Sequence, residues 1–163
     1  MAKKTEKHPS NTQTTKNINP SLPVVGVVGS GSFATAIVKM LVENAPVVHW
    51  CVRNEFVKGA IELKGHNPTY LTAVHFDLKK INITTDINEL VKQCDIVVLA
   101  TPSIYLSDTL DQMNADVKGK IFISAIKGIV PKVNDVVANY LREQFGIGYK
   151  CQVVIACPCH AQE

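Results

Sequence analysis

The segment Gly29-Ser30-Gly31-Ser32-Phe33-Ala34 limits the fold of this chain more than any other part of the sequence. Residues 24–28, which precede it, form a β-branched run typical of a buried parallel strand. The apolar residues that follow recur at the spacing of one helix face. A strand, a G-x-G-x-x-A turn and a helix in this order are the dinucleotide-binding fingerprint, which predicts a βαβ unit in a parallel sheet.

Each small residue of the fingerprint has a separate physical role. Gly29 permits the tight turn, Gly31 lets the backbone approach a pyrophosphate, and Ala34 allows close packing of helix on strand. The start of the helix, with its free N–H groups and partial positive charge, suits phosphate. A glycine turn that only reverses the chain is the alternative, but the flanking strand and helix favour cofactor binding.

The rest of the chain alternates strand-like and helix-like segments. This pattern predicts an α/β fold: a Rossmann-type, doubly wound, mostly parallel sheet with the strand order 3-2-1-4-5-6. The expected strands are 24–28, 47–52, 81–85, 95–100, 120–126 and 152–156, and the expected helices are 32–45, 54–64, 87–94, 104–113 and 132–145.

Composition separates a polar tail from one folded domain. Hydrophobic residues make up 46% of the 163 residues, which is enough to build a core. Residues 1–20 carry four lysines against one glutamate, so they account for the whole net charge of +3. We expect 1–20 to be a disordered polar tail, with an organelle address as an alternative, and 21–163 to be the folded domain. Because the domain is formally neutral, we expect no nucleic-acid partner. No apolar run approaches the ~18 residues of a membrane span, so we also expect no transmembrane helix.

The cysteines suggest a reducing environment and leave two minor alternatives at the C-terminal end. An odd number of cysteines, five in all, is unusual for an extracellular protein, so we expect a cytoplasmic location. The segment Cys157-Pro158-Cys159-His160 contains metal-ligand residue types, but its spacing is poor for zinc. We therefore predict that this segment binds no metal. Metal binding and a nucleophilic thiol in this segment are the two alternatives.

Three further strand ends supply candidate site residues, because ligands of open α/β sheets bind at the carboxyl ends of the strands. Arg53 follows the second strand, where a guanidinium can hold a 2′-phosphate, so NADP is allowed beside NAD. A solvated surface charge is the alternative for Arg53. Pro102 lies in the turn after the fourth strand, and Lys127 follows the fifth strand. From spacing alone, Lys127 either enters the crevice as a substrate-holding ammonium or extends to water.

Several motifs together resemble bacterial glycerol-3-phosphate dehydrogenase, over residues 23–163. In chain order they are Gly29-Ser30-Gly31-Ser32-Phe33, Trp50 with Arg53, Asn67-Pro68-Thr69-Tyr70-Leu71, Ile83-Thr84-Thr85-Asp86, Ala100-Thr101-Pro102-Ser103, Ser124-Ala125-Ile126-Lys127-Gly128-Ile129 and Pro158-Cys159-His160-Ala161-Gln162-Glu163. The resemblance implies reversible hydride transfer between NAD(P)H and dihydroxyacetone phosphate, which gives sn-glycerol 3-phosphate for phospholipid synthesis.

The resemblance also assigns roles to individual positions. It implies that Ser32, Phe33 and Ala161 contact the cofactor and that Arg53 lies near the adenosine ribose. Lys127 would touch both cofactor and substrate. Cys157 and Cys159 would contact the substrate, although the family usually has glycine where this chain has Cys157.

The family also has a second, helical domain that carries the expected general base, and this sequence contains no counterpart to it. Hydride transfer needs aligned reactants and a proton acceptor, so we expect this chain alone to bind cofactor and to catalyse poorly. An uncovered docking face should also favour self-association into a homo-oligomer. A non-catalytic NAD(P)-binding module and the cofactor domain of another two-domain hydroxy-compound dehydrogenase remain alternative functions.

Overall fold

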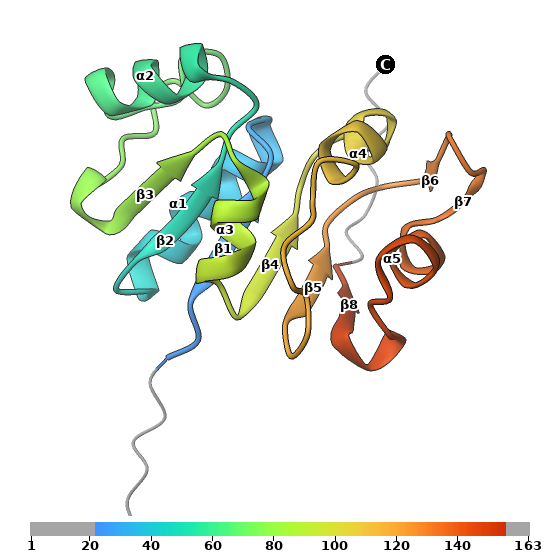
Figure 1. Cartoon of the computed structure of the whole chain (residues 1–163). Coiled ribbons are helices and arrows are strands. Elements are labelled where there is room, and N and C mark those ends of the chain that lie inside the picture. The colour runs from blue at the N-terminus through green and yellow to red at the C-terminus, as the bar shows by residue number, and fades with distance from the viewer. Residues whose placement is uncertain (1–21, 156–163) are drawn as a thin grey trace, which may run out of the picture.

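The computed structural model describes residues 22–155, which form one six-stranded sheet flanked by helices (Figure 1). The strand order is β3-β2-β1-β4-β5-β8, and every neighbouring pair is parallel. The six strands are β1 (Val25–Val28), β2 (Val48–Cys51), β3 (Ile81–Thr84), β4 (Ile96–Leu99), β5 (Ile121–Ser124) and β8 (Gln152–Val154). The predicted fold class and the predicted order 3-2-1-4-5-6 are confirmed, with β8 as the sixth strand.

The helices cover the two faces of the sheet unequally. In the described residues they are α1 (Ser32–Asn44), α2 (Glu55–Lys64), α3 (Ile87–Gln93), α4 (Ser103–Leu110) and α5 (Val137–Phe145), with single 3₁₀ turns η1 (Leu78–Lys80) and η2 (Tyr149–Cys151). Side chains of α1 and α2 share one core with the sheet, and side chains of α3, α4 and α5 share the other. This is the arrangement expected of right-handed crossovers between parallel strands.

Local sequence signals fix where several helices begin and end. Asn54 caps α2 by accepting a hydrogen bond from the Val57 amide at 3.0 Å. Asp86 caps α3 in the same way, through the Asn88 amide at 2.8 Å. Such side-chain caps satisfy amides that have no partner within the helix. Gly65 ends α2 in the left-handed conformation, with φ of 71°.

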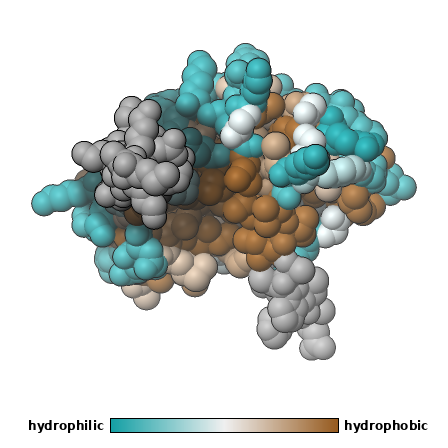
Figure 2. All heavy atoms as spheres, turned by 90° about the horizontal axis from the view of Figure 1, so that it is seen from below, coloured by the Kyte–Doolittle hydropathy of each residue, from teal (hydrophilic) through white to brown (hydrophobic). Residues whose placement is uncertain are grey.

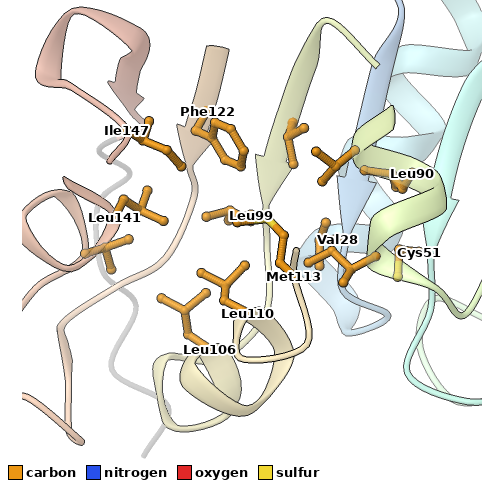
Figure 3. Packing of buried hydrophobic residues seen from close by; sticks show 14 of the residues in the cluster. Val28, Cys51, Leu90, Leu99, Leu106, Leu110, Met113, Phe122, Leu141 and Ile147 are labelled. Atoms are coloured by element: carbon orange, nitrogen blue, oxygen red, sulfur yellow. The ribbon is translucent and has the colours of Figure 1, made fainter. Parts of the chain in front are cut away.

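The larger core lies between the sheet and helices α3, α4 and α5 (Figure 3). Leu106 and Leu110 project from α4 at helical spacing and are fully buried beside Leu99 and Phe122 of the strands. Burial of one such side chain stabilises the fold by about 1.5–3 kcal/mol. On the opposite face of the sheet, Trp50 is fully buried in the core that α1 and α2 cover.

Close packing at the centre of the sheet requires one glycine that sequence analysis did not single out. A Cβ placed on Gly26 of β1 would lie 2.6 Å from a methyl carbon of Leu90 and 2.7 Å from the Cys94 sulfur. Helix α3 therefore packs directly onto the backbone of β1. Any larger residue would push the helix off the strand.

The helix predicted over 132–145 is wrong in its first part. Residues Ile129–Val130 (β6) and Asp135–Val136 (β7) form a small antiparallel hairpin, and α5 begins only at Val137. Asn134 in the hairpin turn has a φ of 51°, a left-handed conformation that asparagine adopts more readily than most residues. The antiparallel pairing therefore replaces the first helical turn that the spacing predicted.

Within residues 22–155, no helix covers strands β5 and β8 on the α1 side of the sheet. The register pairs Ile123 with Val153, so Ile121, Ile123, Val153 and Ile155 share this face of β5 and β8. Three of them, Ile121, Val153 and Ile155, are 40–48% exposed. We call these four residues the β5–β8 face. Figure 2, which shows the molecule from below, has hydrophobic residues across its centre, with hydrophilic residues mainly above them and to the sides.

Candidate functional site

A cavity of about 490 Å³ opens at the carboxyl ends of the central strands. It lies between the turn after β1 and the turn after β4, where the chain winds away to opposite sides of the sheet. Its lining comprises Val28, Gly29, Ser30, Gly31, Cys51, Val52, Arg53, Tyr70, Thr85, Ile87, Thr101, Pro102, Tyr105, Asp108, Thr109 and Gln112. Open α/β sheets bind ligands at this switch point, and the volume is within the usual range of ligand pockets.

Gly29 is required by the protein itself. Its φ is 125°, a conformation that residues with a side chain rarely adopt. A Cβ at this position would lie 2.6 Å from the backbone oxygen of Ala100. The Gly29 amide also donates to the Cys51 carbonyl at 2.9 Å, which joins the turn to β2. The predicted tight turn is therefore present, and it brings together the ends of β1, β2 and β4.

Gly31 is not required by the protein in this way. Its φ is −78°, which any residue adopts, and an added Cβ would meet no protein atom within 4 Å. Gly31 is also the N-cap of α1, with no side-chain cap and no acidic residue in the first turn. The amides of Ser32, Phe33 and Ala34 have no acceptor within residues 22–155. Such a helix start, with empty space before it, fits an anionic ligand.

The carbonyl oxygens of the glycine turn are all held on the protein side. The Trp50 indole donates to the Gly29 carbonyl at 2.6 Å. The Asn67 side-chain amide donates to the Ser30 carbonyl at 3.0 Å. The Thr35 hydroxyl donates to the Gly31 carbonyl at 2.8 Å. These three donors were not predicted from the sequence, because two of them lie far from the glycine turn along the chain.

One side of the cavity is a helix face that sequence analysis also missed. Tyr105, Asp108, Thr109 and Gln112 line the cavity from α4 and the turn that follows it. Their spacing of three, one and three residues places them on one helical face. The buried Leu106 and Leu110 lie on the other side of the same helix. This amphipathic pattern was the available signal. Tyr70 and Thr85 complete the wall from two loops.

Arg53 lines the cavity from the end of β2 and is exposed to solvent. Within residues 22–155 it forms no ion pair. The neighbouring Glu55 is engaged elsewhere, since it accepts a hydrogen bond from the Thr85 hydroxyl at 2.5 Å and lies 3.8 Å from the Lys58 ammonium. The guanidinium is therefore available to an anionic group of a ligand.

Cys51 lies in the cavity wall as an unreactive thiol. Burial, together with the nearby carboxylates of Asp86 and Glu89, raises the pKa of Cys51 to about 12. A thiol with this pKa carries almost no thiolate near neutral pH. Cys51 thus contributes shape and an apolar surface to the cavity, without nucleophilic character.

The structure brings four of the predicted cofactor residues together around the cavity: Gly29, Gly31, Arg53 and Pro102. Ser32 and Phe33 lie exposed at the start of α1, and Ala34 is fully buried against the sheet. Lys127 is exposed just beyond β5 and does not line this cavity. Cys157, Cys159 and Ala161 lie outside the described residues, as does the whole predicted tail at 1–20.

Two other features of the part of the chain that is described bear on function. It contains no group of three or more histidine, cysteine, aspartate or glutamate side chains placed to hold a metal ion. Residues 22–155 also include no helix that is long and apolar enough to cross a bilayer.

Comparison with known proteins identifies one family. The family model described as the N-terminus of NAD-dependent glycerol-3-phosphate dehydrogenase matches residues 24–163. A glycerol-3-phosphate dehydrogenase (NAD(P)+) of Ectopseudomonas mendocina is 33% identical over 122 residues, which cover 75% of this chain and 36% of that protein. A protein of the same name from Azotobacter vinelandii is 34% identical over 105 residues, covering 64% of this chain and 31% of that protein.

Solved structures give the same result at the level of the fold. The glycerol-3-phosphate dehydrogenase of Saccharomyces cerevisiae superposes with a TM-score of 0.63 at 27% identity, covering 76% of this chain and 39% of that chain. The Plasmodium falciparum enzyme gives a TM-score of 0.63 at 25% identity, covering 74% and 38%. This chain spans about a third of the length of the curated relatives it matches, 36% and 31% in the two named above.

Proposed function

Because this chain belongs to the NAD-dependent glycerol-3-phosphate dehydrogenase family, whose N-terminal domain it matches, we propose that it is the cofactor-binding part of such an enzyme. The reaction would be reversible hydride transfer between NAD(P)H and dihydroxyacetone phosphate. Its product, sn-glycerol 3-phosphate, is a precursor of phospholipids. The substrate is thus a small phosphorylated molecule.

The observation that carries this proposal is the space in front of Gly31. Nothing in the described protein occupies it, and the start of α1 faces it with amides that lack acceptors. A pyrophosphate fits both properties, because it needs close backbone approach and N–H donors. In the proposed complex Ser32 and Phe33 bind the cofactor at the start of the helix.

We assign the adenosine half to the part of the cavity beside β2 and α4. Arg53 would bind the ribose end, and its unpaired guanidinium accommodates the 2′-phosphate of NADP. Pro102 and the polar face of α4 would form the opposite wall. Both NAD and NADP are therefore accepted in this proposal, and Arg53 adds affinity only for NADP.

The nicotinamide of the bound cofactor would supply the hydride chemistry. Lys127 follows β5 at the same carboxyl edge of the sheet as the glycine turn, and we propose that its ammonium holds an oxygen of the substrate. Cys157, Cys159 and Ala161 are assigned to the substrate and cofactor pocket from the family resemblance alone. Reduction of the substrate carbonyl would also require a proton donor, and oxidation of the alcohol a proton acceptor. We place this general acid–base group outside these residues.

A cytoplasmic location and self-association are further parts of the proposal. The location rests on the odd cysteine count, and buried Cys51 and Cys94 are both free thiols in the structure. Self-association rests on the exposed apolar side chains of the β5–β8 face.

Titration of the purified 163-residue chain with NADH and NADPH tests the proposal. Calorimetry or nucleotide fluorescence gives the two dissociation constants, and the same sample is then assayed with dihydroxyacetone phosphate. Binding without turnover is the expected result. Turnover would show that the general base lies within these residues, and absence of binding to either nucleotide would refute the proposed function.

A further inference from the structure

The peptide groups that join residues 29 to 32 direct their amides away from the protein, because their carbonyls are hydrogen-bonded on the opposite side. Three consecutive carbonyl oxygens, those of residues 29, 30 and 31, accept hydrogen bonds from the side chains of Trp50, Asn67 and Thr35. All three donor side chains are fully buried, with exposures of 0%. The peptide groups of the turn are therefore fixed in one orientation, with their oxygens directed into the protein.

This orientation matters for an anionic ligand. A carbonyl oxygen carries partial negative charge and an amide N–H carries partial positive charge, so rotation of one peptide group replaces attraction for a phosphate with repulsion. A glycine-rich turn rotates easily, because its residues have few steric limits. Fixing the carbonyls before the ligand arrives lowers the cost of ordering the site on binding.

Asn67 is the centre of this arrangement. Its amide nitrogen donates to the Ser30 carbonyl at 3.0 Å and to the Thr35 hydroxyl at 2.9 Å. Its oxygen accepts from the amides of Thr69 and Tyr70 at 2.9 and 3.1 Å. All the ordinary hydrogen-bonding capacity of the side chain is thus used, which fixes its orientation. The same residue joins the glycine turn to the loop that places Tyr70 in the cavity wall.

We propose that Asn67 and Thr35 are positioning residues for the pyrophosphate of the cofactor: they hold the glycine turn with its amides facing the ligand. The inference rests on the proposed function, since it concerns the same site. It goes beyond that function in assigning a binding role to two buried side chains that do not line the cavity.

Three variants and one control test this role. Asn67→Ala removes the donor to the Ser30 carbonyl. Thr35→Val removes the hydroxyl with little change in shape, and Thr35→Ser restores it. Gln152→Ala is the matched control, because Gln152 also donates from a side-chain amide to two backbone carbonyls, those of Ala138 and Ile147, at the far edge of the sheet.

Each variant is titrated with NADH, with ADP-ribose and with adenosine. NADH and ADP-ribose contain the pyrophosphate, whereas adenosine lacks any phosphate. We expect Asn67→Ala to weaken NADH and ADP-ribose by about tenfold or more, since the freed Ser30 carbonyl loses its fixed orientation. Thr35→Val should weaken both ligands by a smaller factor of about threefold, because the amide of residue 35 still donates to the Gly31 carbonyl while Asn67 loses its hydroxyl acceptor. Adenosine affinity should stay within about twofold, and Thr35→Ser and Gln152→Ala should bind all three ligands nearly as the wild type does.

The outcomes separate the inference from the proposed function. Equal losses for adenosine and NADH would show a general structural role and would overturn the inference, as would an unchanged affinity for NADH. If Asn67→Ala fails to fold, the Thr35→Val and Thr35→Ser pair decides the question alone. A wild-type chain that binds no NADH would refute the proposed function, and the inference with it.

Discussion

The two glycines of the fingerprint should respond to substitution in opposite ways. Gly29 is constrained by the protein, with a φ of 125° and the Ala100 carbonyl oxygen 2.6 Å from an added Cβ. Gly31 has an ordinary φ of −78° and no protein atom within 4 Å of an added Cβ. We therefore predict that Gly29→Ala lowers the stability of the fold, while Gly31→Ala and Gly31→Val lower only the affinity for the cofactor.

The expected loss for Gly29→Ala has two sources. A non-glycine residue held at an unfavourable positive φ costs about 1–3 kcal/mol. A contact of 2.6 Å with a backbone oxygen adds to this, because the strand-end backbone at Ala100 cannot move aside as a flexible side chain can. We expect a total of about 2–4 kcal/mol, which corresponds to a fall in Tm of roughly 7–15 °C for a domain of this size.

Gly31→Ala has no comparable cost. Replacing glycine at a compatible φ stabilises a protein by about 0.4–1 kcal/mol, since the unfolded chain loses freedom, and this gain offsets the loss of a favoured N-cap residue. The added methyl group would instead occupy the space proposed for the pyrophosphate, and valine would fill more of it. We expect NADH affinity to fall by about tenfold for alanine and further for valine, because the backbone can no longer approach the phosphates.

Chemical denaturation of the three variants gives their free energies of unfolding, and titration with NADH gives their dissociation constants. We expect Gly29→Ala to be the least stable of the three variants and Gly31→Val to bind NADH most weakly. A Gly29→Ala variant with wild-type stability would refute the argument from φ and from the Ala100 contact. A Gly31→Val variant with an unchanged dissociation constant for NADH would show that the cofactor does not bind at the glycine fingerprint.

Three further predictions concern the cavity and the exposed face. Cys51 and Cys94 have pKa values raised, mainly by burial, from 9.0 to about 12. Their contribution to the stability of the fold is therefore complete below pH 9 and is lost as the pH rises toward 12. In urea unfolding, the free energy of unfolding of Cys51→Ala should fall less between pH 8 and 10 than that of the wild type, by about 1.4 kcal/mol. Arg53→Gln should weaken NADPH by roughly three- to tenfold and leave NADH within about twofold, and equal effects on both nucleotides would exclude a contact with the 2′-phosphate. Val153→Lys should reduce self-association in sedimentation experiments, whereas Leu63→Lys, at a position 83% exposed on α2, serves as the control and should not.

The fold was predictable because its signals are local and repeated. Each β-branched run and each helical spacing is contained within about ten residues, and alternation of the two patterns allows few topologies. The exception is residues 132–136, where the spacing predicted the start of a helix and the chain completes the β6–β7 hairpin instead. The adjacent Asn134 and Asp135 are common turn residues and were the local sign of this reversal.

The lining of the cavity was predictable where one motif contains the whole reason for a residue. Gly29 and Gly31 follow from the fingerprint, while Arg53 and Pro102 follow from their places at strand ends. The polar face of α4 was visible in the spacing of Tyr105 and its neighbours but was not used. Lys127 shows the limit of the same rule: it lies at the correct edge of the sheet, yet a strand end alone does not determine which side chains reach a given cavity.

The side chains that donate to the carbonyls of the glycine turn could not be predicted from one sequence. Trp50 acts on a carbonyl 21 positions away, and Asn67 on one 37 positions away, so no spacing rule connects donor and acceptor. A buried tryptophan in a strand also reads as ordinary core, because its ring supplies most of its buried area. The fingerprint therefore identifies where the backbone turns, but the orientation of its peptide groups depends on side chains that the fold brings to it. It follows that another chain with the same six-residue motif and no equivalent donors would keep the turn and lose part of its affinity for a pyrophosphate.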